Sequence, residues 1–181
     1  LFVNGTPDNY IVQIKRISRK GIEHVNPGNC DLFHFLNSDH MTKAIFHLDI
    51  NPTSSINLPQ DISLIVNQIS NADSHTKSLR KLSQRLSQYQ DIIPVLNLPE
   101  QVLNTRRELI YQQLNKLPDL YVPKTIRIQP HSPTELINLI DLAEISFPAF
   151  ICEVATHEKH APILLRDKDS ALELYTLAMD G

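Results

Sequence analysis

The sequence predicts an α/β protein whose first half is built on a parallel β-sheet. Short apolar runs alternate with a helical segment over residues 43–97, which is the strand–helix–strand order that brings parallel strands side by side. The run at residues 61–66 is almost continuously apolar, as strands buried on both faces are. From residue 98 onward helices and a hairpin follow, so we expect a second subdomain there.

Four segments of the first half have strand character, because β-branched and aromatic residues are frequent in them and turn-forming residues bound them. They are residues 10–17, 43–50, 61–66 and 92–97. Between the first two, 26-NPGN-29 predicts a turn and residues 31–36 a short helix. The stretch 51-NPTSS-55 predicts a break after the second.

A helix is predicted over residues 74–90. Apolar residues recur there at spacings of three and four, which places them on one helical face: Leu79, Leu82, Leu86 and Tyr89. The chain has no internal repeat and no low-complexity segment, which excludes a solenoid.

A capping box opens the next helix. Thr105 stands at the expected N-cap and Glu108 three residues later, so each side chain can bond the backbone N–H of the other. The helix would present one apolar face, made of Leu109, Ile110, Leu114 and Leu117. The segment 118-PDLYVP-123 ends it, and residues 124–128 are expected to be extended.

A second capping box begins at Ser132 and includes Glu135. Pro133 occupies its first helical position, where the missing N–H is not needed. This helix is predicted to run to about residue 144. After it we expect a pair of strands and a last helix, at residues 149–154, 163–165 and 169–179.

Charge and composition exclude some classes of function. The 181 residues include 17 basic and 20 acidic ones, a net charge of −3, which argues against nucleic acid or a membrane surface as a partner held by bulk charge. No apolar run approaches the roughly 20 residues that span a bilayer, and the N-terminus lacks a signal-peptide pattern. Because the chain opens with Leu1 rather than Met, we expect a segment upstream.

The two cysteines, Cys30 and Cys152, lie far apart in the sequence. Free thiols in a reducing cytoplasm are the favoured interpretation, and a single disulfide is the alternative. Cys152 lies in an apolar run with no base beside it, so we expect a small core residue rather than a nucleophile. No catalytic residue is predicted.

Arg106 and Arg107 fall in the first turn of the helix that Thr105 opens, where the helix dipole disfavours positive charge. An anion docked at the free N–H groups would offset that cost, and two solvated arginines are the alternative. His157 and His160 in the stretch 147–165 are three residues apart and have no third ligand nearby, so the segment predicts a polar turn and no metal site.

Five short motifs follow one another in the second half: 94-PVLNLPE-100, Arg106, 123-PKTIR-127, 147-FP-148 and 169-DSALELY-175. In type, order and approximate spacing they resemble the ATP-grasp ligases, in the glutathione-synthetase-like bacterial form found after tetratricopeptide repeats. Residues 43–96 resemble the domain that precedes these modules. The resemblance implies a Rossmann-like, pre-ATP-grasp-like domain over residues 1–97 and a small α+β, ATP-grasp-like lid subdomain over residues 98–181.

The resemblance also implies ATP with Mg²⁺ as the cofactor. Arg106 matches the helix-opening basic residue that contacts the phosphates, and Thr156 and His157 match a Ser-His pair in the loop that closes over them. Lys159, at the place of a glycine, could partly compensate for what this loop lacks. The chain departs from the family elsewhere in this region, because Cys152 replaces a basic residue and Ala155 and Ala161 replace glycines. Without glycine the backbone does not easily take the positive φ angles that aim N–H groups at phosphate.

Two possible functions follow from the resemblance, and a third interpretation retains the parallel sheet but not the resemblance. The favoured one is a degenerate, non-catalytic ATP-grasp-like module that acts in protein interaction or weak nucleotide binding. Its partner would be another protein or the C-terminal half of the module, whose metal-binding carboxylates would lie beyond residue 181. The alternative is the N-terminal fragment of an ATP-dependent carboxylate–amine ligase that forms an acyl phosphate. The third is a flavodoxin-like domain unrelated to ATP-grasp.

Overall fold

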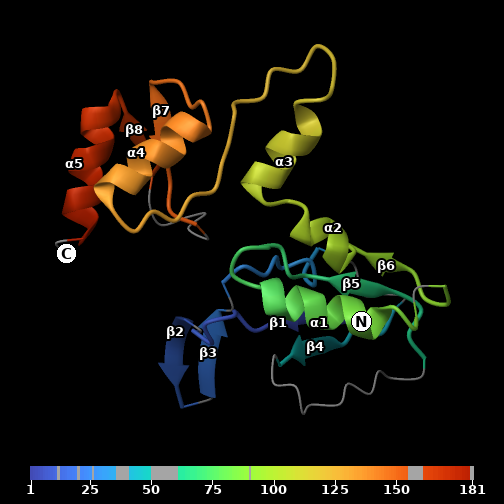
Figure 1. Cartoon of the computed structure of the whole chain (residues 1–181). Coiled ribbons are helices and arrows are strands. Elements are labelled where there is room, and N and C mark those ends of the chain that lie inside the picture. Colours follow the sequence, from blue (N-terminus) through green and yellow to red (C-terminus); the bar gives the residue numbers. More distant parts are fainter. Residues whose placement is uncertain are drawn as a thin grey trace. The chain divides into compact units, whose positions relative to one another are not determined.

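The structure is a computed structural model, and it describes residues 1–11, 13–19, 21–25, 27–35, 41–49, 61–89, 91–154 and 161–179 (Figure 1). The chain forms two compact units, Leu1–Arg106 and Arg107–Gly181. Among the described residues, no helix is long and apolar enough to cross a membrane.

A four-stranded parallel sheet forms the centre of the first unit, with the strand order β4-β1-β5-β6. Its strands are β1 (Phe2–Gly5), β4 (Ile45–Leu48), β5 (Ile65–Asn67) and β6 (Val95–Leu96). Phe2 of β1 lies opposite Ile45 on one side and Val66 on the other. The predicted α/β class and parallel sheet are confirmed, and the sheet is compatible with a Rossmann-like domain.

The helix α1 (Thr76–Leu86) packs on one face of this sheet, within the range predicted for it. Its buried leucines form a core with residues of the strands: Leu79, Leu82 and Leu86 with Val3, Leu48 and Ile65. Gly5 lets β1 approach the helix, because a Cβ there would lie 2.6 Å from Ile69 Cδ1 and 3.1 Å from Ser78 Cβ. The short helix α2 (Pro99–Leu103), which the sequence did not predict, follows β6.

The loop of residues 27–35 contacts the other face of the sheet. The Gln68 side-chain oxygen accepts hydrogen bonds from the backbone N–H groups of Leu32 (2.8 Å) and Phe33 (3.0 Å). The Phe33 ring meets Phe2 edge-on, with 5.1 Å between centroids. The short helix predicted at residues 31–36 is wrong for the described residues 31–35, because Gln68 takes these N–H groups and residues 33–35 form a turn.

A separate antiparallel hairpin, β2 (Gln13–Ser18) and β3 (Gly21–Val25), forms a two-stranded sheet of its own (Figure 1). The strand predicted at residues 10–17 therefore begins later. Tyr10 has a φ of 59°, a left-handed conformation that no regular strand accommodates.

The described residues of the second unit form three helices and a hairpin. These are α3 (Arg107–Leu114), α4 (Pro133–Leu142), β7 (Ala149–Ile151), β8 (Ile163–Leu165) and α5 (Lys168–Met179). The two strands are antiparallel, with Ile151 opposite Ile163, so the predicted hairpin is confirmed. Its core includes the buried residues Leu136, Ile140, Leu165 and Ala171.

The predicted capping box at Ser132 is confirmed. The Ser132 hydroxyl accepts a hydrogen bond from the Glu135 N–H at 3.1 Å. The Glu135 carboxylate in turn accepts from the His131 N–H at 2.7 Å, one residue earlier than the usual partner. Residues 124–128, predicted to be extended, belong to no strand.

The capping box predicted at Thr105 is wrong. Its hydroxyl donates to the Val102 carbonyl at 2.7 Å, and α3 begins only at Arg107. Because α2 ends at Leu103, the Val102 carbonyl of its last turn has no intrahelical partner four residues later, and it accepts hydrogen bonds from both the N–H and the hydroxyl of Thr105.

Candidate functional site

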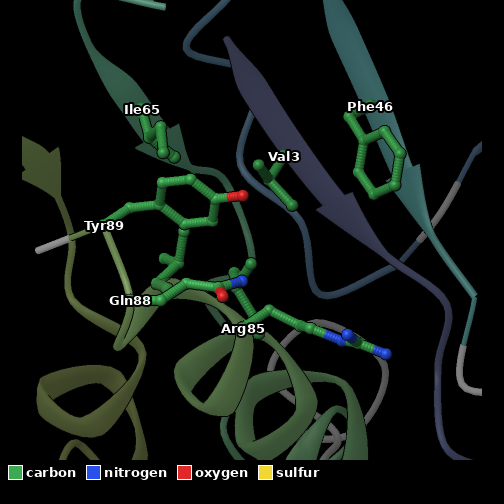
Figure 2. A pocket seen from close by; sticks show the side chains of 8 residues that line it. Val3, Phe46, Ile65, Arg85, Gln88 and Tyr89 are labelled. Carbon is green, nitrogen blue, oxygen red and sulfur yellow. The ribbon is translucent and has the colours of Figure 1, made fainter. Parts of the chain in front are cut away.

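A small cavity lies beneath the C-terminal part of α1, between the helix and the sheet (Figure 2). Its volume is about 10 Å³, the space of one water molecule. Apolar core side chains line it, with Arg85, Gln88 and Tyr89 at the rim. It is a packing gap and is too small for a metabolite.

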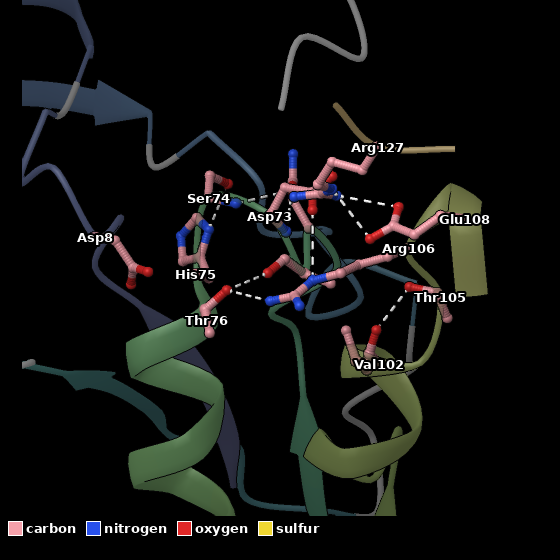
Figure 3. Close-up of polar contacts among 12 residues, drawn as sticks. Asp8, Asp73, Ser74, His75, Thr76, Val102, Thr105, Arg106, Glu108 and Arg127 are labelled. Atoms are coloured by element: carbon pink, nitrogen blue, oxygen red, sulfur yellow. Dashed lines mark hydrogen bonds and ion pairs between the residues drawn. The ribbon is translucent and has the colours of Figure 1, made fainter. Parts of the chain in front are cut away.

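The carboxyl edge of the sheet is the better candidate. Since β1 lies between β4 and β5, the chain leaves β1 toward one side first and returns to the other side later. Ligands of open α/β sheets bind at this kind of switch point, outside the carboxyl ends of the strands. The loops after β1 and β5 and the N-terminus of α1 bring Asp8, Asp73, His75 and Thr76 together here (Figure 3).

His75 is the buried centre of this edge, with none of its surface exposed. Its Nδ1 lies 2.8 Å from the Ser74 hydroxyl and its Nε2 lies 3.4 Å from Asn29 Nδ2. The Asn29 amide is fixed by Gly5, accepting from the Gly5 N–H (2.9 Å) and donating to the Gly5 carbonyl (3.0 Å). Because Asn29 Nδ2 is a donor, Nε2 can accept from it only while the ring proton is on Nδ1.

Burial lowers the pKa of His75, and a backbone hydrogen bond at Gly5 and the charge of Asp8 oppose this shift. The ring is therefore neutral near pH 7. It packs over Gly28, where a Cβ would lie 2.6 Å from the His75 ring carbon Cε1. Enclosed in this way, the imidazole supports the loops around it and cannot reach a substrate as a general base.

The N-terminus of α1 is bonded to a carboxylate of the chain itself. The Lys77 N–H donates to both oxygens of Asp8, at 3.0 and 3.2 Å. The free N–H groups of a helix N-terminus are where a phosphate would dock. Asp8 supplies the negative charge at that position.

Arg106, the predicted phosphate contact, lies at the same edge (Figure 3). Its Nη2 donates to the Thr76 hydroxyl at 2.6 Å, and its Nε forms an ion pair with Asp73 at 3.5 Å. The side chains of Arg106 and Asp73 are only 22% and 10% exposed. The guanidinium is thus held against groups of the first unit.

In the second unit, Arg107 rather than Arg106 reaches the end of β7, where its Nη1 donates to the Cys152 sulfur. Cys152 is an exposed free thiol, so the prediction of a core position is wrong. The reason is that β7 ends at Ile151, and Cys152 follows it outside the hairpin. Arg127 forms a two-point ion pair with Glu108, at 3.0 and 3.2 Å.

The predicted loop residues Thr156, His157 and Lys159 lie outside the described residues. His160, considered and set aside as a metal ligand, lies there too. Within the described ranges, no group of three or more His, Cys, Asp or Glu side chains is placed to hold a metal ion.

Apart from Arg106, the sequence did not single out the residues that form the carboxyl edge. Asp8 and Asn29 lie in loops far along the chain from His75, and their contacts arise only when β1 and β5 pair. One signal was present: the polar stretch 67-NQISNADSHT-76 stands between a buried strand and a helix. Polar residues at that position are typical of the functional end of a parallel sheet.

Comparison with known proteins found no family model, no curated protein and no solved structure that matches the chain.

Proposed function

We propose that this chain is an ATP-grasp-like module without catalytic turnover, which acts by contact with a protein partner and binds nucleotide weakly. One observation carries the proposal. Arg106, the residue that the resemblance assigns to the phosphates, directs its guanidinium to Thr76 and Asp73.

Recruiting Arg106 to a phosphate would require breaking these contacts. Asp73 is only 10% exposed, so loss of the ion pair with Arg106 is costly at this poorly solvated position. Two other groups that could bind a phosphate already have partners in the chain. Arg127 forms an ion pair with Glu108, and the Lys77 N–H at the N-terminus of α1 donates to Asp8. The absence of glycine at residues 155, 159 and 161 supports the same proposal from the sequence.

Thermal unfolding with and without Mg-ATP tests this proposal. A site with micromolar affinity would gain roughly 4 kcal/mol at millimolar ligand, whereas a site with millimolar affinity gains only a few tenths. We expect the melting temperature of the full chain to change no more with Mg-ATP than with Mg-triphosphate. A rise specific to Mg-ATP that saturates at micromolar ligand would overturn the proposal.

The contact between Arg107 and Cys152 favours a second candidate, the ligase fragment. The resemblance expects a basic residue at position 152, and Arg107 brings a guanidinium to that place from the neighbouring helix. If Arg107 serves as the phosphate contact, Arg107→Ala abolishes a Mg-ATP-dependent rise in melting temperature. The control Arg80→Ala, on the exposed surface of α1, leaves that rise unchanged. No rise in the unmodified chain rejects this candidate.

A further inference from the structure

The hairpin β2–β3 exposes isoleucines that a folded protein usually buries. Ile14, Ile17 and Ile22 are 59%, 72% and 62% exposed. The two strands form a sheet without a third strand, so each has an outer edge free of sheet partners among the described residues.

An irregularity in the pairing places these isoleucines on one face. The register shifts between Ile14 and Arg16, so that Ile14 lies opposite His24 and Ile17 opposite Ile22. Residues 22 and 24 share a face of their strand, and their partners Ile14 and Ile17 therefore share it too. Arg16, one position before Ile17, belongs to the other face, where its register partner is Glu23, the acidic residue of the hairpin.

The hairpin is also basic in a chain that is acidic as a whole. Residues 10–25 contain four of the 17 basic residues and one of the 20 acidic ones, while the whole chain carries a net charge of −3. Lys15, Arg16 and Arg19 are exposed. Apolar side chains on one face and positive charge around them define what the hairpin can recognise.

We propose that β2–β3 docks an extended acidic segment of a partner protein, which adds as a third strand beside β2. A strand alternates its side chains between two faces, so a segment of alternating apolar and acidic residues meets the isoleucines with one set and Arg16 with the other. The outer edge of β2 supplies main-chain hydrogen bonds for such a strand. This inference rests on the proposed interaction role and names the surface and the partner.

Charge selects this partner over a second copy of the chain. Two β2–β3 hairpins pairing edge to edge would bring Lys15, Arg16 and Arg19 against the same residues of the other copy. Like charges on neighbouring strands disfavour that pairing. The same positive charges attract an acidic segment and so favour its binding.

The test measures fluorescence anisotropy of a labelled peptide, Glu-Val-Glu-Val-Glu-Val-Glu, titrated with the full chain. We expect it to bind roughly tenfold more tightly than a peptide of the same composition with the valines in one block, and more tightly than its lysine counterpart. Equal affinity for the alternating and block peptides would overturn the proposal. So would binding to anionic vesicles without binding to the peptide, or concentration-dependent dimerisation of the chain that competes with it.

Two variants locate the surface. Arg16→Glu reverses the charge on the face opposite the isoleucines. Ile17→Thr removes apolar surface while keeping a β-branched residue. Each variant is expected to weaken peptide binding about fivefold or more. Arg80→Glu and Ile92→Thr are matched controls on α1 and on a turn where Ile92 is 76% exposed. Unchanged binding by both hairpin variants would contradict the assignment. A thermal response that saturates at micromolar Mg-ATP would reject the proposed function and leave peptide binding unaffected, so the two failures are distinguishable.

Discussion

The carboxyl edge of the parallel sheet and the β2–β3 hairpin both carry groups capable of binding, and they use them in opposite ways. At the edge, Asp8, His75 and Arg106 are hydrogen-bonded to other parts of the same unit. On the hairpin, Ile17 and Ile22 are 72% and 62% exposed. The comparison teaches that polar residues at a usual ligand position can serve to hold loops together. The isoleucines of the hairpin, in contrast, are left exposed to solvent.

Among the substitutions that compare the edge with the hairpin, replacement of a glycine in each region should have the largest effect on stability. Gly28 has a φ of +82°, and a Cβ there would lie 2.6 Å from His75 Cε1 and 2.9 Å from Asn71 Cβ. Gly28→Ala should lower the free energy of unfolding by about 2–4 kcal/mol, through backbone strain and overpacking together. Gly21→Ala in the hairpin turn has φ strain but no atom within 4 Å, and should cost about 1–2 kcal/mol.

Urea unfolding followed by circular dichroism gives both values. Equal losses for the two alanine variants would show that the loops around His75 are not tightly packed.

The next effect concerns an arginine in each region. Arg106→Met removes a hydrogen bond and leaves Asp73, 10% exposed, without this cation, which should cost about 1–3 kcal/mol. Arg16→Met in the hairpin should change stability by no more than about 0.5 kcal/mol, because its side chain is exposed. The same urea titrations measure this pair, and a loss from Arg16→Met as large as that from Arg106→Met would contradict the comparison.

Acidic pH should lower the stability of the folded chain through protonation of His75. Its pKa is lowered in the folded state, mainly by burial, so below the ordinary value of 6.5 the unfolded chain takes up the proton more readily than the folded chain. The free energy of unfolding should therefore fall as the pH drops from about 7 toward the folded pKa. Above about pH 7.5 His75 is neutral in both the folded and the unfolded chain, so it contributes no pH dependence to the free energy of unfolding there.

His75→Gln isolates this contribution. The variant is expected to be less stable at pH 7, and the part of the pH dependence due to His75 should vanish. A slope between pH 7 and 5 identical to that of the unmodified chain would show that His75 titrates normally.

The smallest effect is expected on the isoleucine face. Ile17→Thr should alter the free energy of unfolding by less than about 0.5 kcal/mol, because the side chain is 72% exposed. Leu79→Ala in the core, where the side chain is fully buried, should cost about 2–5 kcal/mol. Thermal unfolding of the two variants checks that the hairpin contributes little to stability. A large loss from Ile17→Thr would mean that the isoleucines support the fold.

The sequence predicted the elements whose signal is local. The leucine spacing predicted α1, and the Ser132–Glu135 pattern predicted the start of α4. The strand β1 was missed although it lies inside the sheet, since Phe2–Gly5 is only four residues long and owes its burial to β4, β5 and α1.

Local patterns failed where two partners competed for one group. Thr105 had the spacing of a capping residue, yet the end of α2 offered its hydroxyl a nearer acceptor. Arg106 had the position of a phosphate contact, but the fold of the first unit directs it to Thr76 and Asp73, about thirty residues earlier in the chain. Such choices depend on tertiary contacts that no sequence window contains.

Backbone amide NMR spectra of the full chain, titrated with Mg-ATP, test the central claim most directly. Because the edge is bonded to the chain's own groups, the amides of residues 71–77 and Arg106 should keep their positions until the ligand reaches millimolar concentration. Saturable shifts of these amides at micromolar Mg-ATP would show that the edge opens to a nucleotide, and would contradict the account.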